Sequence, residues 1–118
     1  MTTVIPNPVR LTVASTAYSN IVGVKIYDNG VYLEGATNRV RFEGLYQNNV
    51  QIGNVSTNRQ HIEYNGKNVL ETSSYSGYTF SLKLRTNDLP NGDYVAVMRY
   101  TKNNVTKNYD VPIRIELT

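Results

Sequence analysis

The sequence predicts an all-β fold, an antiparallel β-sandwich built from seven to nine short strands. Apolar and polar residues alternate with a period of two along most of the 118-residue chain, which is the pattern of strands with one buried face. Turn signals rich in glycine, asparagine and aspartate interrupt this alternation at the spacing of about 8–12 residues that is typical of sandwiches. No stretch shows the apolar period of a helix, so these observations favour a sandwich over an α/β fold.

The first half of the chain is expected to form an extended arm followed by short strands. Residues 1–8 contain Pro6 and Pro8 and form the predicted arm, and a single domain is expected to span residues 9–118. Residues 28–30 read Asp-Asn-Gly, which is a strong signal for a hairpin turn. The candidate strands of this half are residues 9–13, 22–26, 31–34, 39–43 and 45–52.

The middle of the chain contains a second hairpin signal and a long alternating stretch. Asn65-Gly66 separates two candidate strands, residues 61–64 and 67–70. A polar loop, residues 72–77, leads into the alternating stretch. There, one face is expected to point to the core and the other to solvent: Tyr78, Phe80, Leu82 and Leu84 against Thr79, Ser81, Lys83 and Arg85.

Residues 89–94 read Leu-Pro-Asn-Gly-Asp-Tyr and introduce the two C-terminal strands. Asn103-Asn104 is expected to turn the first of these strands into the second. Pro112 has no backbone N–H for a sheet ladder, so the last strand is expected to be an edge strand or to carry a bulge there. The expected inward residues of the two strands are Tyr94, Ala96, Met98 and Tyr100, then Val111, Ile113, Ile115 and Leu117.

The Leu-x-x-Gly-x-Tyr step of residues 89–94 resembles the tyrosine corner of Greek-key β-sandwiches. The resemblance implies that the Tyr94 hydroxyl is hydrogen-bonded to backbone upstream of it, and that the fold is immunoglobulin-like or fibronectin-like. The chain departs from antibody-type domains, because it has neither a cysteine pair nor a tryptophan.

Composition argues against several classes of function. The net charge of +3 comes from 12 basic and 9 acidic side chains that are interspersed, whereas nucleic-acid binding needs clustered basic residues. No apolar run approaches the ~20 residues that are needed to cross a bilayer. The start of the chain lacks the basic and apolar regions of a signal peptide, so we expect a protein used without secretion or one whose leader has been removed.

Residues that carry catalysis or bind metals are few in this sequence. Its single histidine, His61, is two residues from Glu63, so both side chains would lie on one face of a strand. No second histidine and no cysteine can complete a metal site or a catalytic triad, and the two residues are interpreted as a surface His–Glu pair. The sequence therefore predicts a protein that is not an enzyme and that holds no cofactor or metal.

Five residues are candidates for contact with a partner. Val95, Val97 and Arg99 are expected to point outward from one strand, and outward valines either reflect β-propensity or mark a patch that a partner covers. Tyr75, expected at a loop tip, and Tyr46 are the candidate aromatic contacts, because tyrosine combines a flat apolar ring with a polar hydroxyl.

This chain, a small predicted β-sandwich rich in tyrosine, asparagine and threonine, resembles the decoration or cement proteins of phage capsids in composition and architecture. The resemblance implies a virion accessory subunit, made in the host cytoplasm, that stabilises a capsid or other assembly by surface contacts and that could form homo-oligomers. The alternative is a carbohydrate- or surface-binding module of an adhesin or tail fibre at an extracellular surface. Neither hypothesis involves nucleic acid or a membrane.

Overall fold

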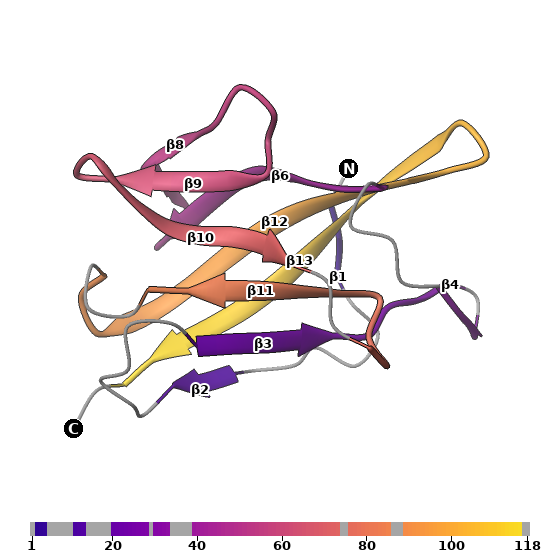
Figure 1. Cartoon of the computed structure of the whole chain (residues 1–118), viewed down its shortest axis with the longest axis horizontal. Coiled ribbons are helices and arrows are strands. Elements are labelled where there is room, and N and C mark those ends of the chain that lie inside the picture. Colours follow the sequence, from indigo (N-terminus) through magenta and orange to yellow (C-terminus); the bar gives the residue numbers. More distant parts are fainter. Residues whose placement is uncertain are drawn as a thin grey trace.

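The protein is an all-β sandwich of two sheets, as the sequence predicts (Figure 1). The computed structural model describes residues 2–4, 11–13, 20–28, 30–33, 39–73, 76–85 and 89–116. These residues form thirteen strands and no α-helix. The count exceeds seven to nine because several strands have only two or three residues, whereas the two C-terminal strands have 11 each.

Sheet A contains the two longest strands at its centre. Its strands follow the order β1-β13-β12-β6-β7, and β2 also pairs with β13. Neighbours among β13, β12, β6 and β7 are antiparallel, whereas β1 and β2 are parallel to β13. The bounds are Thr2–Val4 for β1, Leu11–Val13 for β2, Val40–Gln47 for β6, Val50–Ile52 for β7, Gly92–Lys102 for β12 and Val105–Ile115 for β13.

Sheet B lies in front of sheet A in Figure 1 and is antiparallel, with the order β3-β11-β10-β9-β8. The bounds are Asn20–Val24 for β3, Asn54–Val55 for β8, His61–Tyr64 for β9, Lys67–Ser73 for β10 and Phe80–Leu84 for β11. A separate hairpin pairs β4, Tyr27–Asp28, with β5, Val31–Tyr32, around the predicted Asp-Asn-Gly signal.

The predicted N-terminal arm is partly a strand of the domain. Thr2–Val4 pairs with residues 108–110 of β13, and Leu11–Val13 pairs with residues 113–115. β13 therefore has β12 on one side and β1 and β2 on the other, so it is not an edge strand at residues 108–110 and 113–115. Its register with β12 is continuous through Pro112, so it carries no bulge against β12 there.

The core is formed by the alternating residues of both sheets. Every inward position predicted on β12 is buried, as are Val111, Ile113 and Ile115 on β13; Leu117 lies outside the described residues. The expected phase of residues 78–85 was wrong at its start, because Tyr78 is 36% exposed and Thr79 is 1% exposed, and Ser81, expected to face solvent, is also buried. The Thr79 hydroxyl is buried because it donates to Leu33 O at 2.8 Å and accepts from Ile26 N at 3.0 Å.

Three hairpins turn at residue pairs that contain asparagine and have positive φ. Asn65-Gly66 and Asn103-Asn104 behave as predicted, with φ of 53° and 78° and of 52° and 64°. Asn48-Asn49, with φ of 52° and 63°, does the same and divides residues 45–52 into β6 and β7, so the expected single strand there was wrong. Both central residues of a type I′ hairpin turn need positive φ, a conformation that asparagine tolerates.

The tyrosine corner is present. Tyr94 is 2% exposed, and its hydroxyl donates a hydrogen bond to Pro90 O at 2.6 Å. Desolvation by burial, with a smaller contribution from Tyr64, raises the pKa of Tyr94, while a hydrogen bond with Gln47 partly offsets this rise. The hydrogen bond joins β12 to the residues that precede it, and β12 supplies the middle of the outer face of sheet A.

Candidate functional site

A β-bulge in β6 shapes the outer face of sheet A. Val97 is paired with Gly44, and the next residue, Met98, is paired with Phe42, so Glu43 has no partner of its own. Because of the extra residue, Phe42 and Leu45 both point into the core, although they are three positions apart. Glu43 and Gly44 consequently lie together on the outer face, opposite Val97.

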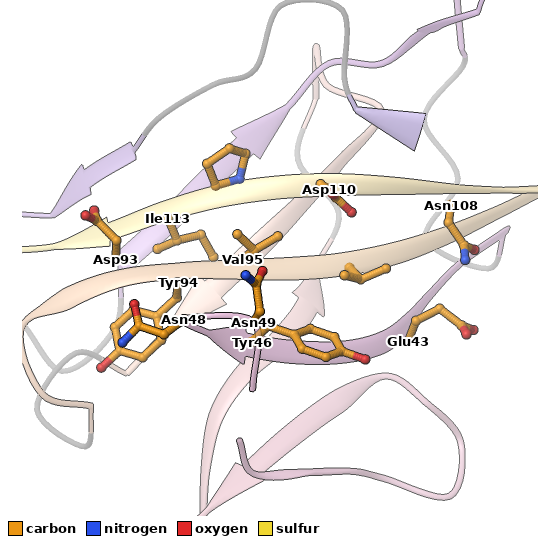
Figure 2. A pocket seen from close by; sticks show the side chains of 12 residues that line it. Glu43, Tyr46, Asn48, Asn49, Asp93, Tyr94, Val95, Asn108, Asp110 and Ile113 are labelled. Carbon is orange, nitrogen blue, oxygen red and sulfur yellow. The ribbon is translucent and has the colours of Figure 1, made fainter. Parts of the chain in front are cut away.

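An apolar row crosses the three central strands on this face. Val95 of β12 is paired with Tyr46 of β6 on one side and with Pro112 of β13 on the other. Val97 lies in the next row, between Gly44 and Asp110. All of these side chains are half-buried, and Figure 2 shows Tyr46, Val95 and Asp110 on the same side of their strands. The row is a central surface that remains accessible to solvent.

The row forms the floor of an open groove with a volume of about 520 Å³. A volume of this size lies within the ~300–1,000 Å³ of small-molecule sites. The Asn48-Asn49 turn borders one side of the groove, and β13 borders the other. The lining residues are Glu43, Tyr46, Asn48, Asn49, Asp93, Tyr94, Val95, Val97, Asn108, Asp110, Pro112 and Ile113.

The Tyr46 ring lies against Gly44. A Cβ atom added at Gly44 would be 3.0 Å from Tyr46 Cε1 and 3.4 Å from its Cζ, so the ring occupies the space that a side chain would otherwise fill. The ring therefore lies against β6 and contributes a flat apolar surface to the groove, which Val97 also lines.

The polar lining of the groove is rich in hydrogen-bond acceptors. Glu43 Oε1 and Asp110 Oδ1 are buried atoms that accept no hydrogen bond from the described part of the chain. Glu43 Oε1 does form ion pairs, at 3.3 Å with Arg99 Nε and at 3.8 Å with Arg59 Nη1, but without the alignment of a hydrogen bond. Desolvation raises the pKa of Asp110. Both carboxylates thus have unused acceptor capacity.

The structure brings four of the five predicted contact residues to this face. Tyr46, Val95 and Val97 line the groove, and Arg99 lies at its rim, where it pairs with Glu43. Tyr75 lies outside the described residues. Whether these residues bind a partner stays a prediction.

Sequence reasoning missed the polar half of the groove. Glu43, Asp93, Asn108 and Asp110 were not among the candidate contact residues, because no linear pattern reveals a bulge or the pairing of β6 with β12. Two local signals were available: a glycine inside a strand pattern at Gly44, which often marks a bulge, and the turn dipeptide Asn48-Asn49.

Other chemical sites are sparse in the described ranges. His61 is half-buried and Glu63 is exposed, and both line a second open depression formed with residues 54–58. The described residues contain no group of three or more His, Cys, Asp or Glu side chains that could hold a metal ion. Within the same ranges, no helix has the length and apolarity needed to cross a membrane.

Comparison with known proteins found no matching family model, no matching curated protein and no matching solved structure. The class that the fold defines is an all-β sandwich, and the outer face of sheet A carries an acceptor-rich groove.

Proposed function

We propose that the protein is a non-catalytic contact module that attaches to a partner surface through the outer face of sheet A. The groove carries the proposal, because its apolar row is accessible and two of its carboxylates have an oxygen without a hydrogen bond. An unsatisfied buried acceptor is unfavourable by about 1–3 kcal/mol, so a partner that supplies donors there gains affinity. The proposal includes a Greek-key, immunoglobulin-like topology, which the Tyr94–Pro90 hydrogen bond supports.

Two partner surfaces are compatible with such a module. The resemblance in composition favours a virion accessory role, in which the chain decorates a capsid and stabilises it by repeated contacts. An adhesin or tail-fibre module would instead attach to a cell envelope. In both cases the outer face of sheet A makes the contact, so substitutions on this face test the proposal independently of the partner.

The test is co-sedimentation of the purified full chain with virions and with cell envelopes prepared from the organism that encodes it. We expect wild type to sediment with one of the two preparations. Val97→Asp places a charge on the apolar floor and should weaken attachment at least about tenfold. Val97→Lys, which cannot repel Asp110, should do the same.

Ile21→Asp is the matched control, because Ile21 is a 53%-exposed apolar residue on sheet B. Thermal unfolding of each variant checks that the fold is intact. Attachment that is equal in wild type and both Val97 variants contradicts the proposal, and so does the absence of attachment to either preparation.

A further inference from the structure

We propose that the groove binds a neutral saccharide, with a sugar ring packed on Tyr46 and sugar hydroxyls donating to Asp110 and Glu43. This inference rests on the proposed function and specifies what the module recognises. Its three supports are the exposed aromatic surface, the unused acceptors and the charge of the lining.

Tyr46 supplies the surface on which a sugar ring can pack. The ring lies against Gly44, and that contact limits its rotation. Its neighbours on the sheet are Val95 and Val97, so a ligand ring of similar size meets an apolar floor of three side chains. A saccharide ring has apolar C–H faces and a rim of hydroxyls, which matches an apolar floor with polar borders.

The acceptors of the groove require hydroxyl or N–H donors. A carboxylate is an acceptor only, and Asp110 Oδ1 and Glu43 Oε1 accept no hydrogen bond from the described residues. The two residues lie in neighbouring rows on either side of Val97, since Val97 pairs with Asp110 and lies opposite the bulge at Glu43. The last torsion of a carboxylate side chain is broad, so a modest rotation turns an oxygen into the groove.

The charge of the lining selects a neutral ligand. Among the described residues that line the groove, Glu43, Asp93 and Asp110 are acidic and none is lysine or arginine. Outside the lining, Arg99 and Arg59 pair with Glu43, and Arg114 pairs with Glu116 at 3.7 Å. A ligand with carboxylate or sulfate groups would meet repulsion from the acidic lining, which contains no cation.

The size of the groove favours a sugar over a protein surface. Its borders also carry the amides of Asn48, Asn49 and Asn108, which can both donate to and accept from sugar hydroxyls. The groove volume of about 520 Å³ suits one or two sugar rings better than the broad, flat contact of a stable protein interface.

The test is a panel of immobilised neutral and acidic oligosaccharides, probed with the full-length protein and followed by solution titration of any neutral sugar that binds. We expect binding to neutral members and none to uronate, sialylated or sulfated ones. Tyr46→Ala and Asp110→Ala should each weaken binding at least about tenfold. Tyr46→Phe keeps the ring and should retain most of the binding that Tyr46→Ala loses.

Tyr78→Ala is the control for removal of a surface tyrosine, since Tyr78 lies on sheet B, and thermal unfolding confirms that each variant is folded. The inference is overturned if no neutral saccharide binds, if only acidic ones bind, or if folded Tyr46→Ala binds normally. If no saccharide binds while both Val97 variants still lose co-sedimentation, the groove contacts protein, and the proposed function survives without this inference. If the Val97 variants co-sediment normally, the proposed function fails whatever the panel shows.

Discussion

The outer faces of the two sheets each carry a tyrosine ring that lies over a strand glycine, but the surroundings of the two rings differ. On sheet B, Tyr78 covers Gly23, and Lys25 Nζ is 5.7 Å from the centre of the ring. On sheet A, Tyr46 covers Gly44 beside carboxylates that have unused acceptors. The ring on sheet B therefore has a cation of the protein itself over its face, whereas the ring on sheet A borders an open groove.

This difference shows that an exposed tyrosine does not by itself mark a binding surface. Both rings lie over a strand glycine, yet only Tyr46 lines the groove, together with Glu43 and Asp110, each of which has a carboxylate oxygen without a hydrogen bond. On sheet B, Ser81 Oγ also lacks a hydrogen bond, but Ser81 is not among the residues that line the groove. Function is thus better sought where a tyrosine ring and unsatisfied carboxylate oxygens line the same groove.

The largest difference in stability between the two faces is expected when Gly23 on sheet B and Gly44 on sheet A are replaced by alanine. A Cβ at position 23 would be 2.4 Å from Tyr78 Cδ1, whereas a Cβ at position 44 would be 3.0 Å from Tyr46 Cε1. Gly23→Ala must displace the Tyr78 ring and should destabilise the protein by roughly 1–2 kcal/mol, within the range for overpacking. Gly44→Ala needs only a small shift of its ring and should cost less than about 0.5 kcal/mol. Urea unfolding of both variants checks this ranking, and the reverse order would contradict the comparison.

The parts of the fold that the sequence predicted are those with local causes. The alternation around Tyr94 and Met98 is set by which side chains can be buried, and the corner depends on residues 89–94 alone. Asn103-Asn104 was recognised as a turn, but the identical dipeptide Asn48-Asn49 was missed because apolar residues on both sides suggested one continuous strand.

The candidate site was predictable only in part, because it depends on pairing between distant segments. Val95 and Val97 follow from the register of one strand, but their neighbours Tyr46 and Asp110 come from β6 and β13. The bulge at Glu43 shifts the later part of β6 by one residue, so the alternation of residues 39–43 cannot be continued to Tyr46. Pro112 suggested an edge strand or a bulge, whereas β13 pairs with β1 and β2 from the start of the chain, a long-range pairing that no local pattern reveals.

The second-largest effect on stability compares Tyr94, whose hydroxyl forms a hydrogen bond within the protein, with Tyr46, which contributes its ring to the groove. Tyr94→Phe removes the hydrogen bond to Pro90 O and should destabilise the protein by ~1 kcal/mol. Tyr46→Phe should leave the free energy of unfolding unchanged. Denaturant unfolding measures both variants. Equal free energies of unfolding for Tyr94→Phe and wild type would show that the hydrogen bond between Tyr94 and Pro90 does not stabilise the fold.

The smallest effect concerns the charge of the groove. Desolvation raises the pKa of Asp110 in the folded protein above its unfolded value, so folding favours the protonated carboxyl. The associated stability is fully present below the unfolded pKa and is lost as pH rises through the folded pKa. Asp110→Asn removes this loss, so the variant should gain stability relative to wild type as pH rises from acid to neutral, by no more than about 0.5 kcal/mol.

On sheet B, Ser81→Ala alters an uncharged group, and its effect on stability should not depend on pH. Denaturant unfolding of the three proteins at acid and neutral pH tests both expectations. If the difference in free energy of unfolding between Asp110→Asn and wild type does not depend on pH, the groove imposes no desolvation on this carboxylate. The acidic groups of the groove on sheet A would then not differ in stability cost from the uncharged Ser81 on sheet B.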